Sequence, residues 1–482
     1  MDFPGRFRAF LPRAGFAAFI AFAALTGIAG VDSALATDLD GGAGAAQKAA
    51  AKIAPGLWTG TVTLKRADSE PGTADLVYGM TLRLLEGDGG ALADIPEQSM
   101  YGYPLDSVSY SATRVGFVLS AMGPGQELKF DGLLTAKSIG KAPAILGTVR
   151  GTTWKGSFML AAAPASSYPG EKKFSFSVEG GNLPGTLLVP PGKVGGIPVV
   201  VLLSGAGAAD RDGNNFNVPG RNDALLRLAR ALADRGVASF RFDKRGTGEA
   251  YRMTGDESTL PYGTHIRDAA AAIAAVQALP GWSRVLVAGM NEGAWIGAAA
   301  LNGLAGAEAW ADGLAVIAAS GKSPVSLVRE SFATLPPDLA AEAENILVKL
   351  IEGEEYPEPS PTLADFFDPA RKARLSSWLG FDPSLELAAV PAPLLMVFGD
   401  RDLQAPASEF DLLLEARPNA AAFVIPGMNH ALKLVGDDEE ANYASFSDPE
   451  YPVPDSLADL LAGFALVRPA PAGLPRYERN PR

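Results

Sequence analysis

The pattern of hydrophobic and polar positions divides the chain into two parts with different periodicities. Between about residues 56 and 160, short runs alternate apolar and polar side chains, and glycine and proline separate the runs. Such alternation is typical of strands that bury one face of an antiparallel sheet. Examples are Leu57–Leu64, Tyr78–Leu84 and Arg114–Leu119. We therefore predict a small antiparallel β domain, a sandwich or small barrel, over residues 53–161.

After residue 172 the pattern changes to continuous apolar runs separated by segments with helical periodicity. A run such as Val199–Leu203 has no polar alternation, as a strand buried on both faces requires. The further predicted strands are Val237–Phe242, a strand from Val285, Gly313–Ile317, Leu394–Phe398 and Ala422–Ile425, and the predicted helices include Leu225–Leu232 and Ile266–Leu279. Strands that alternate with helices predict the α/β class, with a doubly wound and mostly parallel sheet.

The boundaries follow from the segments between these patterns. Residues 162–172 contain two prolines, a glycine and two serines, and predict a linker between the β domain and an α/β domain over 173–466. The proline-broken helical stretch at about 323–388 is expected to cap the carboxyl edge of the sheet. The proline-rich tail 467–482 has no predicted role.

The first 36 residues have the layout of an export signal. A basic stretch with Arg6, Arg8 and Arg13 precedes the apolar run Phe16–Leu25, and Ala34–Ala36 fits an A-x-A cleavage site. Residues 37–52 are small and polar and predict a tether. We expect an exported protein, periplasmic or extracellular, without a transmembrane anchor once the signal is removed.

Composition narrows the chemistry. The net charge of -13 argues against nucleic acid as a partner and favours small molecules. The chain has no cysteine, which excludes disulfides, thiol catalysis and thiolate metal sites. With only His265 and His430, a metal site built on several histidines is not expected, and neither is a cofactor.

The most informative motif follows the strand that begins at Val285. Gly289-Met290-Asn291-Glu292-Gly293 has the layout of the G-x-S-x-G nucleophile elbow, a strand, a sharp turn and a helix, but asparagine occupies the serine position. Asparagine suits the positive φ of an elbow better than most residues do. The substitution therefore predicts that the turn is kept while the nucleophile is lost.

An acid and a base follow in the order that α/β-hydrolases use, each at the end of a strand. His430 is the predicted base, and Asp402 is preferred over Asp400 as the acid because the preceding loop allows its carboxylate to reach back to the imidazole. The backbone N–H groups of Glu292, Gly205 and Ala206 are the candidate oxyanion donors, and they do not depend on the side chain at position 291.

These motifs together resemble a known family. The chain is similar to secreted bacterial α/β-hydrolases of carboxylesterase type that carry an N-terminal lipocalin-like β domain. The stretches that carry the resemblance are Ser204–Asn214, Asp243–Gly248, Gly399–Gln404, Asn429–His430, Pro96–Gln98 and Gly102–Leu105. The resemblance implies hydrolysis of short-chain esters by a serine, with an aspartate matching Asp402 and a histidine matching His430. Three positions depart from that pattern: Asn291 replaces the serine, Met290 a histidine and Ala206 a serine.

Several functions stay open at this point. The protein is a silenced hydrolase that binds a small acyl or ester-like ligand, a weak esterase in which His430 activates water, or an envelope interaction module that works through its β domain. Ser320, at the end of another strand, is a weak substitute nucleophile because it lacks an elbow. Serine and asparagine codons can differ by one base, so a sequence change at position 291 is a further alternative.

Two other features receive a structural interpretation. His265 stands at a predicted helix start and is expected to be structural. The stretch Asp210–Asn214 resembles a calcium loop only superficially, and we expect it to order the loop beside the site through internal salt bridges.

Overall fold

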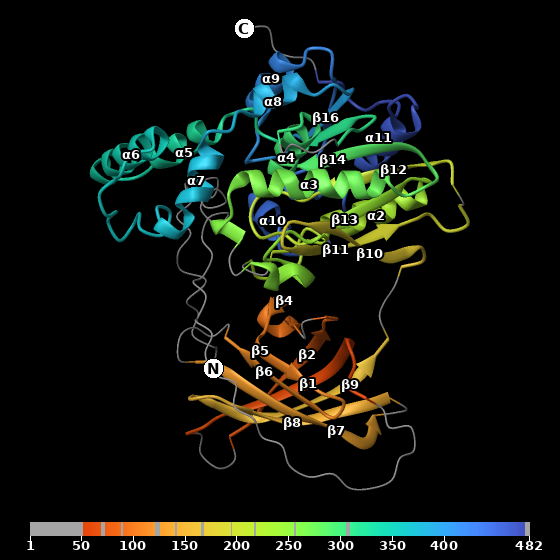
Figure 1. Ribbon diagram of the computed structural model, residues 1–482, viewed down its shortest axis with the longest axis vertical. Coiled ribbons are helices and arrows are strands. Elements are labelled where there is room, and N and C mark those ends of the chain that lie inside the picture. The colour runs from red at the N-terminus through yellow and green to blue at the C-terminus, as the bar shows by residue number, and fades with distance from the viewer. Residues whose placement is uncertain are drawn as a thin grey trace. The chain divides into compact units, whose positions relative to one another are not determined.

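The computed structural model describes residues 52–68, 73–87, 90–120, 126–139, 142–164, 168–193, 195–215, 218–254, 257–304 and 309–477. They form two compact units, which Figure 1 shows coloured from red at the N-terminus to blue at the C-terminus. The β unit consists of residues 52–168 and the short segment 218–221, and the α/β unit consists of the remaining described residues. The predicted export signal and most of the tether lie outside the described residues.

The β unit is one antiparallel sheet with the order β4-β3-β2-β1-β9-β8-β7-β6-β5. Its elements are β1 (Gly56–Arg66), β2 (Leu76–Leu84), β3 (Ala91–Ile95), η1 (Pro96–Gln98), β4 (Met100–Pro104), β5 (Asp106–Tyr110), β6 (Arg114–Leu119), β7 (Leu128–Ile139), β8 (Ala142–Arg150) and β9 (Trp154–Ala163). The two edge strands, β4 and β5, are consecutive in the chain and are joined by the buried Leu105.

Three phenylalanine rings pack together among the aliphatic side chains in the core of the β unit. Phe117 stacks on Phe130 with ring centroids 4.5 Å apart, and Phe158 packs edge-on against Phe130 at 5.4 Å. The ring of Phe158 needs a glycine at position 147 of the neighbouring strand, because a Cβ there would lie 2.2 Å from the ring. The alternation in the sequence therefore corresponds to one buried apolar face and one face that is more exposed to solvent.

The sheet of the α/β unit has the order β10-β11-β13-β12-β14-β15-β16-β17. Its strands are β10 (Glu171–Val178), β11 (Gly181–Leu188), β12 (Ile197–Leu203), β13 (Ala238–Phe242), β14 (Trp282–Met290), β15 (Leu314–Ile317), β16 (Leu394–Gly399) and β17 (Ala421–Ile425). The six strands from β13 to β17 in this order pair in parallel, while β10 and β11 pair antiparallel at one edge.

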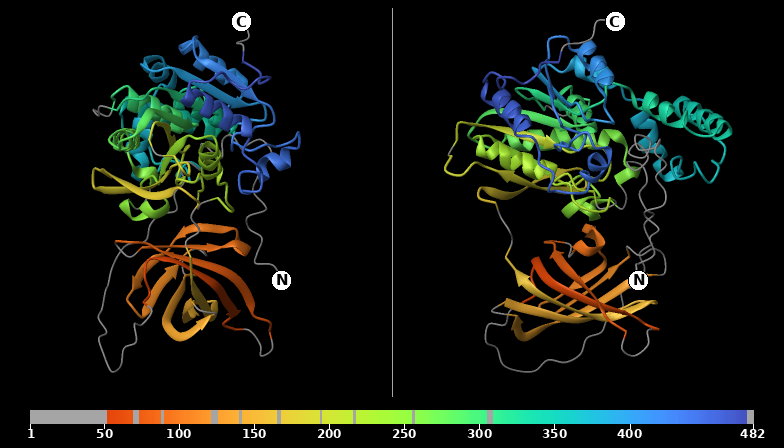
Figure 2. Two further views of the ribbon diagram at one scale, coloured as in Figure 1. Left: turned by 90° about the vertical axis from the view of Figure 1, so that its right-hand side faces the viewer. Right: turned by 180° about the vertical axis from the view of Figure 1, so that it is seen from behind.

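The α/β unit also contains helices, most of which pack on this sheet (Figures 1 and 2). They are α2 (Ala224–Asp234), α3 (Tyr262–Gln277), α4 (Glu292–Leu301), α5 (Pro324–Phe332), α6 (Pro337–Glu352), α7 (Lys372–Leu379), α8 (Pro383–Ala389), α9 (Ala407–Ala416), α10 (Glu439–Ala444) and α11 (Asp455–Leu466), with the short η2 (Gly248–Met253), η3 (Glu257–Thr259) and η4 (Pro369–Arg371). Val285 and Val287 of β14 belong to the core with α3 and α4, whereas Leu286 lies beside Phe464 of α11. Alternate residues of β14 are thus buried against different helices, which explains the continuous apolar run.

The α/β class predicted from the sequence is confirmed, and every predicted strand and helix of that part is present within a few residues. The pattern missed the antiparallel pair β10 and β11, which begins inside the predicted linker at Glu171. These two strands alternate polar and apolar residues because they lie at the edge of the sheet, so the search for continuous apolar runs passed over them.

The helical stretch at 323–388 is divided between two positions. Helices α5 and α6 project away from the sheet, and α7 returns to it (Figures 1 and 2). Helix α8 packs against α4 and α9, where the backbone oxygen of Glu386 accepts a hydrogen bond from Asn302 at the end of α4. None of the helices that the structure describes is both long enough and apolar enough to cross a membrane.

Candidate active site

Asn291 lies in a strained turn between β14 and α4. Its φ is 49° and its ψ is −122°, a conformation that side chains rarely adopt. Two backbone hydrogen bonds hold the turn: the Asn291 N–H donates to the oxygen of Ile317 at 2.8 Å, and its oxygen accepts from the N–H of Ala294 at 2.9 Å. The parallel neighbour β15 therefore fixes the position of residue 291.

The flanking glycines are required by close backbone contacts. A Cβ at Gly289 would lie 2.3 Å from the nitrogen of Ala294, and a Cβ at Gly293 would lie 2.6 Å from the oxygen of Leu203. Real Cβ atoms do not come so close, so both positions need glycine. The local sequence thus builds the elbow although its central residue is not serine.

The structure brings Asn291, His430 and Asp402 together in one hydrogen-bonded line. Nδ2 of Asn291 lies 2.8 Å from Nε2 of His430, and Nδ1 of His430 lies 2.9 and 3.1 Å from the two carboxylate oxygens of Asp402. A carboxylate only accepts, so Nδ1 carries the proton and Nε2 of a neutral imidazole accepts from the asparagine amide. The amide N–H therefore occupies the place that the O–H of a nucleophile would take.

Asp402 is oriented by the start of its own loop. One carboxylate oxygen accepts the N–H groups of Gln404 and Ala405, both at 2.8 Å, and its side chain is fully buried. Asp400 points elsewhere, because its carboxylate accepts the N–H of Gly427 at 2.7 Å. The geometry distinguishes the two aspartates in the way that the loop length predicted.

A buried amide network holds the loop of His430 against the loop of Asp402. Nδ2 of Asn429, which is fully buried, donates to Oδ1 of Asn442 at 2.8 Å and to the hydroxyl of Ser445 at 2.7 Å. Asn442 in turn donates to the backbone oxygen of Arg401 at 2.9 Å. Sequence reasoning missed this network, because its members lie in α10 and in two separate loops.

The candidate oxyanion donors surround the elbow. Glu292 is the first residue of α4, so its N–H has no acceptor within the helix and lies at the positive end of the helix dipole. On the facing loop, a Cβ added to Gly205 would lie 3.6 Å from Cβ of Asn291, so the two backbones are close. Ala206 follows Gly205 in that loop. These N–H groups are the ones that an acyl-transfer site uses to stabilise an oxyanion.

Lys244 fixes the shape of that loop. Its ammonium group donates to the backbone oxygens of Gly205, at 2.8 Å, and of Gly207. The side chain is buried, and burial lowers the pKa of Lys244 below its usual value, although the carboxylates of Glu257 and Glu292 oppose that shift. A buried ammonium bridging two carbonyl groups restrains the backbone that presents the Gly205 and Ala206 N–H groups.

Behind the elbow lies a cluster of buried charged side chains. Glu292 accepts from Arg374 of α7 at 3.2 Å, and both side chains are at most 5% exposed. Oε1 of Glu257 lies 3.2 Å from Nε2 of His265, and both are at most 4% exposed. The first pair joins the elbow to α7, so the capping segment and the elbow are connected through opposite charges.

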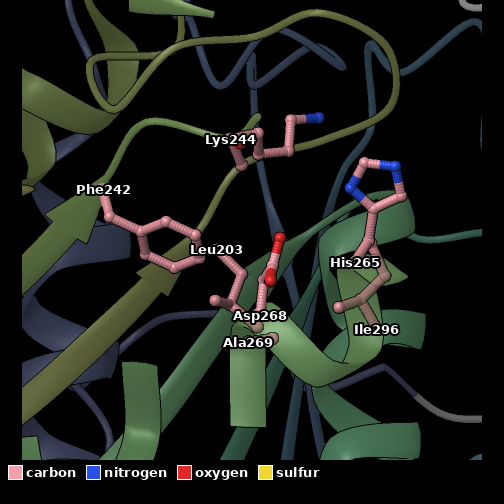
Figure 3. A pocket seen from close by; sticks show the side chains of 8 residues that line it. Leu203, Phe242, Lys244, His265, Asp268, Ala269 and Ile296 are labelled. Atoms are coloured by element: carbon pink, nitrogen blue, oxygen red, sulfur yellow. The ribbon is translucent and has the colours of Figure 1, made fainter. Parts of the chain in front are cut away.

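A cavity of about 20 Å³ borders this cluster, with room for about one water molecule. Figure 3 shows that Asp268 and His265 reach it from α3, while Lys244 comes from the segment after β13. Ser204, beside the oxyanion loop, also lines it. A cavity of this size is too small for a substrate.

Burial lowers the pKa of His265 well below its usual value, and the nearby positive charges of Arg374, Lys244 and Arg245 add to that shift. His265 is therefore neutral in the folded protein near pH 7. Its position beside Glu257 agrees with the structural interpretation drawn from the sequence.

The prediction that salt bridges form within Asp210–Asn214 is wrong, because the ion pairs of this loop have partners outside it. Arg211 pairs with Asp243 at the end of β13 at 2.5 Å, and Asp212 pairs with Arg241 at 2.8 Å. Within the loop, Asp210 accepts the N–H groups of Asp212 and Asn214, both at 2.9 Å. The partners of the loop, Arg241 and Asp243, lie in or just after β13, which is distant in sequence, so the sequence pattern did not reveal them.

Other candidates have separate roles. The hydroxyl of Ser320 accepts the N–H of Lys322 at 3.0 Å, and the Ser320 backbone oxygen accepts from Trp295.

In the part of the chain that the structure describes, no group of three or more histidine, aspartate or glutamate side chains is placed to hold a metal ion.

No protein-family model matches the chain, and no curated protein matches it. Three solved structures are similar at low identity. The 2,6-dihydroxy-pseudo-oxynicotine hydrolase is 16% identical over 62% of this chain and 68% of its own, with a TM-score of 0.38. Est1E from Butyrivibrio proteoclasticus is 14% identical over 57% and 96%, with a TM-score of 0.36. An esterase from Pyrococcus furiosus is 18% identical over 55% and 87%, with a TM-score of 0.35.

Proposed function

We propose that this protein is an exported member of the α/β-hydrolase superfamily whose site binds a small acyl or ester-like ligand but is catalytically silenced. One observation carries the proposal: the amide of Asn291 lies 2.8 Å from Nε2 of His430, in the position of the nucleophile. The mostly parallel sheet, the elbow and the His430–Asp402 pair support this proposal.

The chemistry of the carboxamide explains the silencing. An amide nitrogen is not a useful nucleophile, and it does not ionise near pH 7, so His430 has no hydroxyl to activate. Losing the nucleophile of a triad hydrolase lowers turnover by about 10⁶-fold, while the oxyanion donors and binding alone retain about 10³ to 10⁴ over water. The remaining groups favour binding of an acyl compound over its cleavage.

Hydrolysis of p-nitrophenyl acetate and butyrate tests this proposal. We expect little activity from the wild type and from Asn291→Ala, which serves as the control, and at least about a thousandfold gain in Asn291→Ser. The gain is expected to disappear when His430→Gln is added. Because Ser at position 291 needs the same positive φ, circular dichroism of each variant checks that the fold is kept.

Two other outcomes would replace the proposal. Substantial wild-type hydrolysis that is lost in His430→Ala would identify a weak esterase in which His430 activates water. If Asn291→Ser stays inactive and the protein binds a partner through residues 53–160, the β unit is the functional part. Sequencing codon 291 from the source DNA tests whether asparagine is the encoded residue or the result of a sequence change.

A further inference from the structure

We propose that Asn291 is itself a modification site, at which the protein slowly hydrolyses its own carboxamide to give aspartate. A carboxamide is an acyl group, and here it lies in a site built for acyl transfer. Its nitrogen, which would be the leaving group, is 2.8 Å from Nε2 of His430. The inference concerns the elbow residue and does not depend on the ligand proposed above.

The reaction needs only water as a co-reactant. His430 takes a proton from water, whose oxygen forms a bond to Cγ of Asn291. The bond between Cγ and Nδ2 then breaks, and the protonated imidazole returns the proton to the departing nitrogen, which leaves as ammonia. Aspartate and ammonium are the final products, with no change in oxidation state. This use of one imidazole as base and then as acid is the proton transfer of acyl-transfer enzymes.

The surroundings favour this step at Asn291 over other asparagines. Asp402 lies 2.9 Å from Nδ1 of the imidazole and favours the tautomer in which the lone pair of Nε2 faces the Asn291 amide. Asn442 donates its amide to the backbone oxygen of Arg401, and Asn302 donates its amide to Glu386, so both lack an imidazole partner. They provide internal references within the same polypeptide.

The product would have a different chemistry from the starting protein. An aspartate at position 291 places a carboxylate at the elbow, and carboxylates are nucleophiles in covalent catalysis. The conversion would therefore supply the oxygen nucleophile that the encoded sequence lacks. The protein as encoded would stay silenced until this hydrolysis, which the poor amide leaving group makes slow.

The peptide that contains residue 291 provides the test by mass spectrometry. Purified full-length protein is incubated at neutral pH in water labelled with ¹⁸O, and digested after increasing times. We expect residue 291 to become α-linked aspartate carrying one labelled oxygen, while Asn302 and Asn442 remain amides. The rate is expected to fall about a hundredfold or more in His430→Gln and in Asp402→Asn.

Three results would overturn the proposal. The first is an unchanged amide at residue 291 after long incubation of the wild type. The second is the same rate in folded His430→Gln. The third is isoaspartate at position 291, which would show attack by the backbone nitrogen of Glu292 through a cyclic imide. The third result is read from the wild type alone, so it decides even if the variants do not fold. None of these measurements uses ester hydrolysis. A failure of the proposed function can therefore be distinguished from a failure of the self-hydrolysis proposed for Asn291.

Discussion

The two sides of Asn291 differ in how they use polar side chains. On one side, His430 and Asp402 form a short line that can move a proton. On the other side, Glu292 and Arg374 form a buried pair that joins the elbow to α7. The hydrogen-bonded line ends in an amide and not in a hydroxyl, whereas both members of the charged pair are present. The site thus keeps the buried ion pair that connects the elbow to α7, although a nucleophile is absent at residue 291.

The largest expected effect comes from breaking the charged side. Arg374→Met leaves the carboxylate of Glu292 buried without its partner, so we expect a loss of about 3–5 kcal/mol in the free energy of unfolding of the α/β unit. Urea unfolding followed by tryptophan fluorescence measures it. Arg329→Met is the matched control, because its pair with Glu344 is nearly half exposed and should contribute less than about 1 kcal/mol. Equal losses in both variants would contradict a supporting role for the buried pair.

Lys244→Met connects the two sides. Removing the ammonium leaves the oxygens of Gly205 and Gly207 unpaired, and we expect a loss of about 2 kcal/mol in unfolding free energy. In the Asn291→Ser background the same change should lower kcat about a hundredfold, because the oxyanion donors lose their position. Lys349→Met, which removes a pair near the surface, should change neither quantity. A loss of stability with unchanged kcat would limit Lys244 to a structural role.

The pH dependence of stability is the next largest effect. His265 is neutral in the folded protein because its pKa is lowered, while in the unfolded chain it titrates near 6.5. Below 6.5 the unfolded state binds more protons, so stability decreases as the pH falls, by up to about 1.4 kcal/mol per pH unit. Urea unfolding at a series of pH values should show a smaller decrease for His265→Gln. Identical pH profiles for the two proteins would contradict this assignment.

The smallest expected effect concerns strain at the elbow. Because φ at residue 291 is 49°, Asn291→Gly should be more stable than Asn291→Ala by about 1 kcal/mol. Asn302 has φ −83°, and there we expect the opposite order, with alanine more stable than glycine. Thermal unfolding of the four variants measures the reversal. The same order at both positions would show that the turn relaxes when its side chain changes.

Much of the candidate site could be predicted from local sequence. The glycines at 289 and 293 and the strand before them predict the elbow. The contact that requires Gly289 is local, with Ala294, whereas the contact that requires Gly293 is with the distant Leu203 at the end of β12. The placement of Asp402 and His430 after two strands was also readable, because parallel strands bring their carboxyl ends to the same edge of the sheet.

The supporting residues could not be predicted in the same way. Lys244 follows a buried strand and Glu292 begins a helix that is otherwise apolar and buried, so each signals that a charged side chain must find a partner. Neither signal names the partner. Arg374 is 82 residues from Glu292, and Gly205 is 39 residues from Lys244.

The sequence by itself determined the two kinds of sheet, the elbow and the order of acid and base, because each depends on periodicity or on a turn of a few residues. Only the tertiary structure decided how the buried charges pair, and that the amide of Asn291 faces Nε2 of His430. The physical reason is that burying a charge or an amide requires a partner in space, and the fold sets which distant residue meets that requirement.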